Sequence, residues 1–366
     1  MLVSQPVLAA GIDTTINNAL QPIADIVAGF IFFEVSIFGS QLPLIVLWLI
    51  GASLFFTLYF KFLNLRGFKH AFELLRGDYS KPGQSGELSH FQALATAVSG
   101  TVGIGNISSV AIVISVGGPG ATFWLIVAGF LGMASKFIEC TLGTKYRQEN
   151  PDGSVSGGPM FYLDKGLAEC GLPRLGKTMA WYYAICIVIG CLGVGCMFQA
   201  NQAYVQMVNV TGGSDSFFAL RGWLFGAVLA GLVALVIVGG IRSIARVTSR
   251  LVPFMAILYL LTAVIVIGAN YADVPWAIYA IVSNAFSPEG VTGGVIAVLV
   301  LGFRRAAFSN EAGIGSSSIA HAAVKTREPV SQGYVAMLEP FIDTVIVCTT
   351  TALLITVTVY EPGMVS

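Results

Sequence analysis

The feature that most constrains this sequence is a run without any charged residue, from Phe91 to Ser135. A transmembrane helix needs about 20 residues to cross a hydrocarbon layer of about 30 Å, so the run is too long for one crossing. Gly117-Gly118-Pro119-Gly120 interrupts it with residues typical of a tight turn. We therefore predict two transmembrane helices joined by a short hairpin.

Further apolar runs of spanning length follow the same pattern. They are Gln41 to Phe60, Thr178 to Val210, Gly222 to Ile241, Leu251 to Asn270, Val291 to about Ala323, and Phe341 to Tyr360. Together they predict about eight spans. The composition agrees, because 55% of residues are hydrophobic and only 10% are charged, whereas about a quarter are charged in soluble domains. We predict an all-α polytopic membrane protein, with residues 1–366 forming a single transmembrane domain.

The positions of Lys and Arg predict the orientation, because basic loops stay cytoplasmic. No Lys or Arg precedes Lys61, and the basic residues then gather in the stretches 61–81, 136–177, 242–250 and 325–327. This places those stretches on the cytoplasmic side of the cell membrane and the N-terminus on the extracellular side. Residues 1–40 are expected to be extracellular or interfacial, with an interfacial or re-entrant helix over 16–40. The 19 basic and 19 acidic residues balance, so the sequence lacks the basic surface that nucleic-acid binding needs.

Glycine clusters in the first half of the uncharged run, in Ser99-Gly100-Thr101-Val102-Gly103-Ile104-Gly105-Asn106. Each glycine costs a helix about 1 kcal/mol relative to alanine, so unwinding is cheap here. Broken membrane helices can hold a carboxylate at free N–H groups and a cation at free carbonyls. Thr101 and Asn106 would add oxygen ligands that suit sodium. The alternative is that the glycines only let two helices pack closely.

A second segment resembles this one. Gly103-Ile-Gly105-Asn-Ile-Ser108 is matched by Gly313-Ile-Gly315-Ser-Ser-Ser318, in a span of opposite predicted direction. Paired glycine-interrupted segments are typical of inverted-repeat transporters. The second break falls either between Gly302 and Arg305, which makes Glu311 a candidate for a gate salt bridge, or at Gly313, which lets Ser309 and Asn310 line the site. Interfacial anchoring of Arg304, Arg305 and Glu311 is the alternative.

Two more groups of polar residues interrupt apolar helices. Gln199, Asn201 and Gln202 are predicted to place at least one amide in the interior of the bundle, for a ligand or an interhelical hydrogen bond. Asp343 is a candidate for cation binding or a structural ion pair. No His/Asp/Glu or Ser/His set lies within the spans, so we do not predict an enzyme, and a channel would need polar faces along several helices.

Several motifs together resemble the alanine or glycine:cation symporter family. They are Gly100-Thr-Val-Gly-Ile-Gly-Asn106, Gly117-Gly-Pro-Gly-Ala121, Phe123-Trp124, Phe308-Ser-Asn-Glu-Ala-Gly-Ile-Gly315, Ala320-His-Ala-Ala323 and Phe341-Ile-Asp-Thr344. The resemblance implies a LeuT-like inverted repeat with broken helices. In it, residues 41–60 would be an extra N-terminal span, 91–270 the first five-helix repeat, and 291–360 the first two helices of the second. The last three core helices of the family would be missing from this chain.

The resemblance also implies an activity, sodium-coupled symport of a small neutral amino acid by alternating access. The coupling ion would be sodium, with no organic cofactor, and the protein would be a monomer in membrane lipid. The implied substrate-binding residues are Thr101, Gly103, Gly105, Gln199, Asn201, Phe308, Ser309, Asn310 and Gly313. Sodium would be bound at Ser99, Thr101, Val102 and Asn106, with Glu311, Arg304, Arg305 and Asp343 as gating or coupling candidates. Proton coupling through Glu311 and Asp343, or a fragment that does not transport, are the alternatives.

Overall fold

The computed structural model describes residues 18, 21–22, 25–29, 31–37, 40–79, 83–286 and 294–360. The helix expected over 16–40 therefore lies partly outside the described residues. Within them, residues 25–29 are helical, but β1 (Glu34–Ile37) pairs antiparallel with β2 (Ser40–Pro43). The expectation of a helix is therefore wrong at its end.

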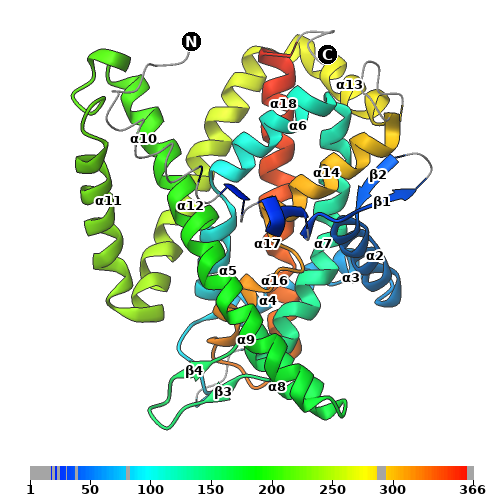
Figure 1. Ribbon diagram of the computed structural model, residues 1–366, viewed down its shortest axis with the longest axis vertical. Coiled ribbons are helices and arrows are strands. Elements are labelled where there is room, and N and C mark those ends of the chain that lie inside the picture. Colours follow the sequence, from blue (N-terminus) through cyan, green and yellow to red (C-terminus); the bar gives the residue numbers. More distant parts are fainter. Residues whose placement is uncertain are drawn as a thin grey trace.

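The rest of the described chain is almost entirely helical (Figure 1). The elements before the first long connection are α2 (Leu44–Tyr59), α3 (Leu63–Arg66), α4 (Phe68–Arg76), α5 (His90–Thr101), η1 (Gly105–Ser109), α6 (Val110–Gly117) and α7 (Gly120–Lys145). They are followed by β3 (Gln148–Glu149), β4 (Val155–Ser156), α8 (Pro159–Glu169), α9 (Pro173–Gly190), η2 (Cys191–Phe198), α10 (Gln199–Val210), η3 (Gly213–Asp215), α11 (Gly222–Ile237) and α12 (Gly240–Ala269). The last group is η4 (Tyr271–Asp273), α13 (Val274–Phe286), α14 (Gly294–Asn310), α15 (Ser316–Ala322), α16 (Pro329–Ala336), α17 (Leu338–Pro340), η5 (Phe341–Cys348) and α18 (Thr349–Thr358).

Among the described residues, several helices are long and apolar enough to cross a membrane. They are Gly120–Lys145, Pro173–Val210, Gly240–Ala269 and Pro329–Thr358, and the bent pair His90–Thr101 and Gly105–Gly117 makes a fifth candidate. Helices α2 and α11 are apolar but shorter. The prediction of a helical membrane protein is confirmed by these elements.

The largest errors in the predicted boundaries are at charged residues. Helix α7 continues through Lys136 to Lys145, α12 begins at Gly240 rather than Leu251, and the last long helix begins at Pro329 rather than Phe341. A charge ends the apolar stretch of a sequence, but it does not end a helix when the side chain finds a partner or reaches the interface. Pro329 suits a first helical turn, where its missing N–H costs nothing.

Helix α7 is the central packing element, in contact with α2, α13, α14, α15, α16 and η5. One end of it packs in an apolar cluster with α6, α14 and α18, around Leu125, Val113 and Val298. Its other end packs with α4, α5 and α16 around Met133, Leu94 and Val335. In contrast, α10 and α11 lie at the edge of the molecule (Figure 1). The helices that carry the uncharged run therefore form the middle of the fold.

Three of the described segments are π-helical: η1, η2 and η5. Such turns contain one extra residue and occur often at functional sites. The segment η5 lies inside the continuous helix Pro329–Thr358. In the C-terminal part of this helix, the hydroxyl of Thr351 forms a hydrogen bond with the hydroxyl of Tyr259 in α12.

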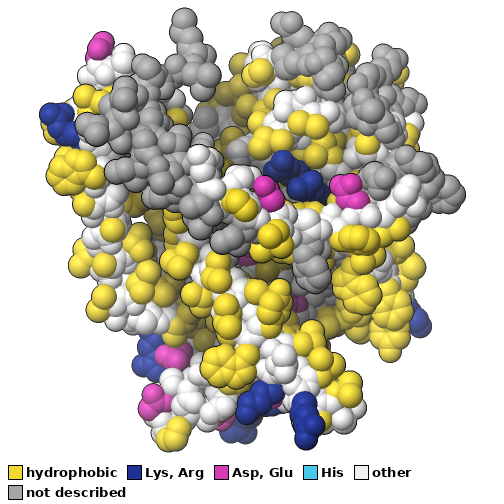
Figure 2. Space-filling model, in the orientation of Figure 1, with side chains coloured by type: hydrophobic (Ala, Val, Ile, Leu, Met, Phe, Trp, Pro, Cys, Tyr) yellow, Lys and Arg dark blue, Asp and Glu magenta, His cyan; other side chains and the backbone are white. Residues whose placement is uncertain are grey.

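The visible surface separates apolar from charged side chains. Hydrophobic side chains cover much of the middle of this face, whereas many of the Lys and Arg side chains gather at the lower end, where α8, β3 and β4 lie (Figures 1 and 2). An apolar belt with charged ends is what a bilayer requires of a spanning protein.

Candidate functional site at the helix breaks

The first break lies where the glycine-rich motif predicted it. Helix α5 begins with a capping box between Ser89 and Gln92, and it ends at Thr101, because the backbone of Val102 is extended at φ −76° and ψ 107°. The chain turns by 51° before it resumes as η1. The N–H of Gly103 donates a hydrogen bond of 2.8 Å to Asn106 Oδ1, which replaces a partner that a continuous helix would supply.

The second break is at Gly313, one of the two predicted positions. Helix α14 ends at Asn310 and α15 begins at Ser316, and Glu311, Gly313 and Gly315 between them have φ of 53°, 89° and 100°. A left-handed backbone favours glycine and is strained in Glu311.

The alternative position, between Gly302 and Arg305, is wrong. Gly302 lies inside α14, where a Cβ would be 2.6 Å from the carbonyl oxygen of Ala121. It therefore serves close packing between α14 and α7.

A buried polar cluster joins the two breaks to η5. Asn106 Nδ2 donates to Asp343 Oδ1 at 2.7 Å and to Ser309 Oγ at 3.3 Å. Ser309 and Thr344 each donate to Asp343 Oδ2 at 2.8 Å, and Asn310 Nδ2 donates to Thr344 Oγ1 at 3.0 Å. All five side chains are at most 2% exposed. No ion pair connects Asp343 to another described residue, so hydrogen bonds rather than a positive charge hold this carboxylate.

An apolar cavity of about 220 Å³ borders the first break. It is lined by Val102, Gly103, Ile104, Asn106, Ile107, Met255, Ala256, Tyr259 and Val347. On the other side of the break, a Cβ added to Gly103 would lie 3.7 Å from Gln199 Oε1. The structure thus brings Gln199 of α10 beside the unwound turn, while Gly105 is buried within η1.

Other predicted site residues are not in this cluster. Ser99 is exposed and donates to Thr96 O at 2.6 Å, and the buried Thr101 hydroxyl points back to Val98 O at 3.4 Å. Asn201 lies on the exposed surface of α10, and Phe308 is 38% exposed. Of the implied sodium ligands, only Asn106 belongs to the cluster.

A salt bridge between Glu311 and an arginine of α14, one of the alternatives for these residues, is absent from the described part of the chain. Arg304 lies over the ring of Phe32, 4.5 Å from its centroid, and Arg305 is half-buried. Glu311 instead accepts a hydrogen bond from the Ser316 hydroxyl, within its own connection. The structure therefore does not contain the salt bridge that was expected for a break between Gly302 and Arg305.

Sequence reasoning missed a second buried group of charges. Lys136 and Glu139 of α7 meet Glu339 of α17 and Ser317 of α15. The signal was present, since Lys136 and Glu139 are spaced three apart and share a helix face. However, a charge at the end of an uncharged run predicts the start of a loop, and in a loop this spacing has no meaning.

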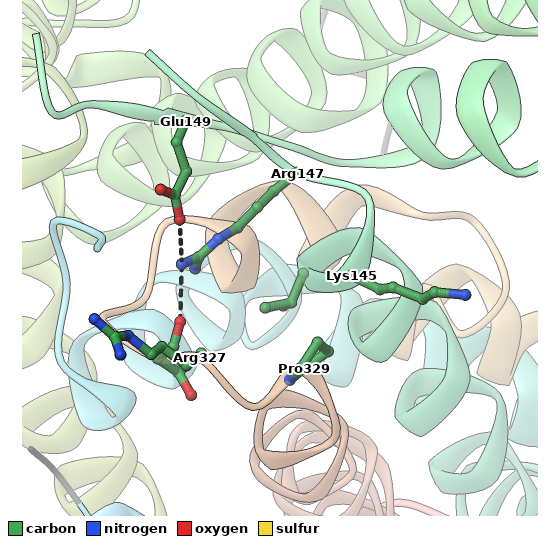
Figure 3. A pocket seen from close by; sticks show the side chains of 7 residues that line it. Lys145, Arg147, Glu149, Arg327 and Pro329 are labelled. Atoms are coloured by element: carbon green, nitrogen blue, oxygen red, sulfur yellow. Dashed lines mark hydrogen bonds and ion pairs between the residues drawn. The ribbon is translucent and has the colours of Figure 1, made fainter. Parts of the chain in front are cut away.

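A third polar site holds the connections at the end with β3 and β4 together. Arg147 donates to the carbonyl oxygens of Ala322, Val324, Ser85 and Thr326, at 3.1, 2.7, 3.1 and 2.8 Å. It also lies 3.4 Å from Glu149 in a pocket of about 300 Å³ (Figure 3). Neighbouring backbone pairs Leu88 with Val324. Arg147 therefore links the segment before α5 to the segment after α15.

Comparison with known proteins shows which family this chain belongs to. A family model described as the sodium:alanine symporter family matches residues 28–365. The chain belongs to this family. The family resemblance expected from the motifs is thus confirmed, as is the expectation of a transporter rather than an enzyme.

Curated relatives in the sodium:alanine symporter family agree. The chain is 39% identical over 316 residues to the sodium/alanine symporter AgcS of Methanococcus maripaludis, covering 86% of this chain and 68% of that protein. It is 37% identical to the amino-acid carrier protein AlsT of Bacillus subtilis, covering 84% and 62%. It is 35% identical to a B. subtilis protein named "probable sodium/glutamine symporter GlnT", covering 85% and 62%. The chain thus spans about two thirds of the length of these relatives.

Proposed function

We propose that this chain takes part in sodium-coupled symport of small neutral amino acids, alanine or glycine, by alternating access. The observation that carries the proposal is the contact between two broken helices, made through the buried cluster of Asn106, Ser309 and Asp343. Unwound backbone deep in a membrane protein is tolerated where it lines a binding site. Membership of the family and the names of its relatives support the same activity.

The substrate would lie at the first break. The N–H groups of Gly103 and Gly105 would bind its carboxylate, with Thr101 and Gln199 as side-chain partners. Residues of α10 and of the second break, namely Asn201, Phe308, Ser309, Asn310 and Gly313, would complete the pocket. Gln199 Oε1 would lie 3.7 Å from a Cβ added to Gly103, so this amide is near enough to the unwound turn to contact a substrate bound there.

Sodium would bind at the same break, at carbonyl and side-chain oxygens of Ser99, Thr101, Val102 and Asn106. Asn106 Oδ1 already orients the Gly103 N–H group. A cation at this oxygen would therefore change the position of a group that binds substrate. This shared residue gives a physical reason for coupling between ion and amino acid.

The arrangement proposed for the whole chain is the LeuT-like inverted repeat. Residues 41–60 would be the extra span, 91–270 the first repeat and 291–360 the start of the second. Both glycine motifs lie at helix breaks, which supports the repeat. The N-terminus would lie outside the cell membrane, because the basic connections would be cytoplasmic, and the carrier would act as a monomer.

The test is uptake of radiolabelled alanine into proteoliposomes that hold the full-length protein, with sodium replaced by potassium at constant pH. We expect uptake to require sodium, and Asn106→Ala to weaken the dependence on sodium at least about tenfold, which corresponds to about 1.4 kcal/mol. Ser115→Ala is the matched control, because Ser115 is exposed and bonds only to its own helix. Uptake that ignores sodium would show the coupling assignment to be wrong.

A further inference from the structure

A buried charge cluster lies between α15, α7 and α17, and the proposed function does not use this cluster. Lys136 Nζ lies 3.3 Å from Glu339 Oε1 and 3.8 Å from Glu139 Oε1. Lys136 also donates to Ser317 Oγ, which donates to Glu339 Oε1 at 2.8 Å. Lys136 and Glu339 are fully buried and Glu139 is 6% exposed. These four residues are called the Lys136 cluster below.

The charges in the Lys136 cluster do not balance. Two carboxylates face one ammonium, so the cluster would carry a net negative charge if both acids were ionised. An unpaired charge is costly in a buried site. The N–H of Gly313 donates to Glu139 Oε2 at 3.1 Å, but Glu139 Oε1 and Glu339 Oε2 are buried without a hydrogen-bond partner in the described chain.

The surroundings of the Lys136 cluster supply no second cation among the described residues. The titratable groups around it are Cys140 on α7, Tyr162 on α8, Tyr183 on α9, Glu311 before α15, His321 on α15 and Asp343 in η5. Glu311 adds negative charge. His321 Nδ1 lies 3.0 Å from Gln332 Oε1, and Gln332 Nε2 lies 2.6 Å from His90 Nδ1. His321 Nε2 is buried without a hydrogen-bond partner in the described chain, so no ion pair joins this imidazole to the acids.

We propose that Glu139 and Glu339 share one proton beside Lys136, so that the Lys136 cluster is a proton-binding site controlled by the position of α15. One acid as the neutral carboxylic form and one as the carboxylate match the single ammonium. The added hydrogen also gives the cluster a donor for one of the two oxygens that lack a hydrogen bond. Because the two acids interact through Lys136, the proton belongs to the pair rather than to either residue.

The link to α15 comes from the donors that hold the two carboxylates. Glu139 is held by the N–H of Gly313 in the second break, and Glu339 by the hydroxyl of Ser317 in the first turn of α15. Both donors favour the ionised acids. Movement of α15 away from α7 would remove them, so the pair would bind its proton more tightly, and protonation would in turn favour the displaced position. Only the coupling between the proton and movement of α15 rests on the proposed carrier function.

Infrared spectroscopy of the purified full-length protein in lipid tests the site without reference to transport. A protonated carboxylic acid has a carbonyl stretch that carboxylates lack and that shifts in D2O. We expect this band at neutral pH, and we expect Glu139→Gln or Glu339→Gln to remove it. Glu149→Gln is the matched control, because its side chain is 56% exposed. A spectrum without the band, or a band that survives both glutamine variants, overturns the proposal.

A milder variant covers the case in which a buried glutamine prevents folding. Ser317→Ala removes one donor to Glu339 and leaves every charge in place. We expect the acid band of this variant to persist to higher pH than that of the unmodified protein, because the ionised form has lost a partner. A titration curve of the band that Ser317→Ala does not move would overturn the link to α15. Sodium-dependent uptake can fail or succeed independently of either spectrum.

Discussion

At the scale of single residues, Asn106 connects the first break to the rest of the molecule. Its Oδ1 accepts from the backbone of Gly103, and its Nδ2 donates to Asp343, which lies far along the chain. One amide thus satisfies both a free backbone group and a buried carboxylate. The asparagine amide has two N–H donors and an acceptor oxygen on separate atoms, so it can bond both groups at once.

Replacing Asn106 with alanine tests this double role through stability. Asn106→Ala leaves the Gly103 N–H and Asp343 Oδ1 short of partners, so we expect the free energy of unfolding to fall by about 1–3 kcal/mol. Thermal unfolding in detergent measures the loss. Asn209→Ala is the control, because Asn209 is exposed on α10, and equal melting temperatures for both variants would contradict the role of Asn106.

The sequence identified most members of the buried cluster one by one, but not their contacts. Asn106, Ser309, Asn310 and Asp343 each stood out as a polar residue in an apolar span. Their meeting depends on how α14 and η5 pack against η1, which is a tertiary property without a local signal. Lys136 and Glu339 were missed for a different reason, because charge was taken to mark the end of a span.

At the scale of elements, the second break depends on glycine in a way that a substitution can measure. Gly315 has φ 100°, and a Cβ there would lie 2.4 Å from Pro159 Cγ of α8. Gly315→Ala therefore combines backbone strain with overpacking, and we expect the free energy of unfolding to fall by about 2–4 kcal/mol.

The control for Gly315→Ala is Gly226→Ala in α11, where no atom lies within 4 Å of an added Cβ. Alanine is the better helix former, so this change should be neutral or stabilising by up to about 1 kcal/mol. Melting curves of the two variants in the same detergent make the comparison. A Gly315→Ala protein as stable as Gly226→Ala would contradict the left-handed backbone at Gly315 and its close contact with Pro159.

Helix existence was easier to predict than helix ends. Apolar length located the cores of α7, α12 and the last long helix, because a span must be apolar to enter a bilayer. Each of these helices extends beyond its apolar stretch and includes a charged residue, Lys136, Arg250 or Glu339. Lys136 and Glu339 are tolerated there because they pair with each other. Sequence alone does not say which charges have partners.

At the scale of the whole molecule, Arg147 forms hydrogen bonds with two segments that are far apart in the sequence, one before α5 and one at the end of α15. Its planar guanidinium donates to four carbonyl oxygens in two segments, residues 85 and 322–326. Lysine keeps the charge but has no planar fork to reach these oxygens. Arg147→Lys should therefore loosen both segments without unfolding the protein.

Hydrogen exchange measures this loosening directly. The amides of Leu88 and Lys325 bond across the two segments, to Ala323 O and Leu88 O. We expect both to exchange about tenfold faster or more in Arg147→Lys, which corresponds to a local loss of about 1.4 kcal/mol. Arg174→Lys is the control, because Arg174 is exposed on α9. Unchanged exchange at both amides would show that other contacts hold the segments.

The π-helical segment η5 has a consequence for how one helix meets two partners. An α-helix turns by about 100° per residue, and the extra residue of the π-helical segment rotates the start of η5 relative to α18 by about that angle. Asp343 can then face Asn106 while Thr351 faces Tyr259. Deleting one residue from Phe341–Cys348 would restore the α-helical register and force a choice between these two faces, so the chain length here is as constrained as the side chains.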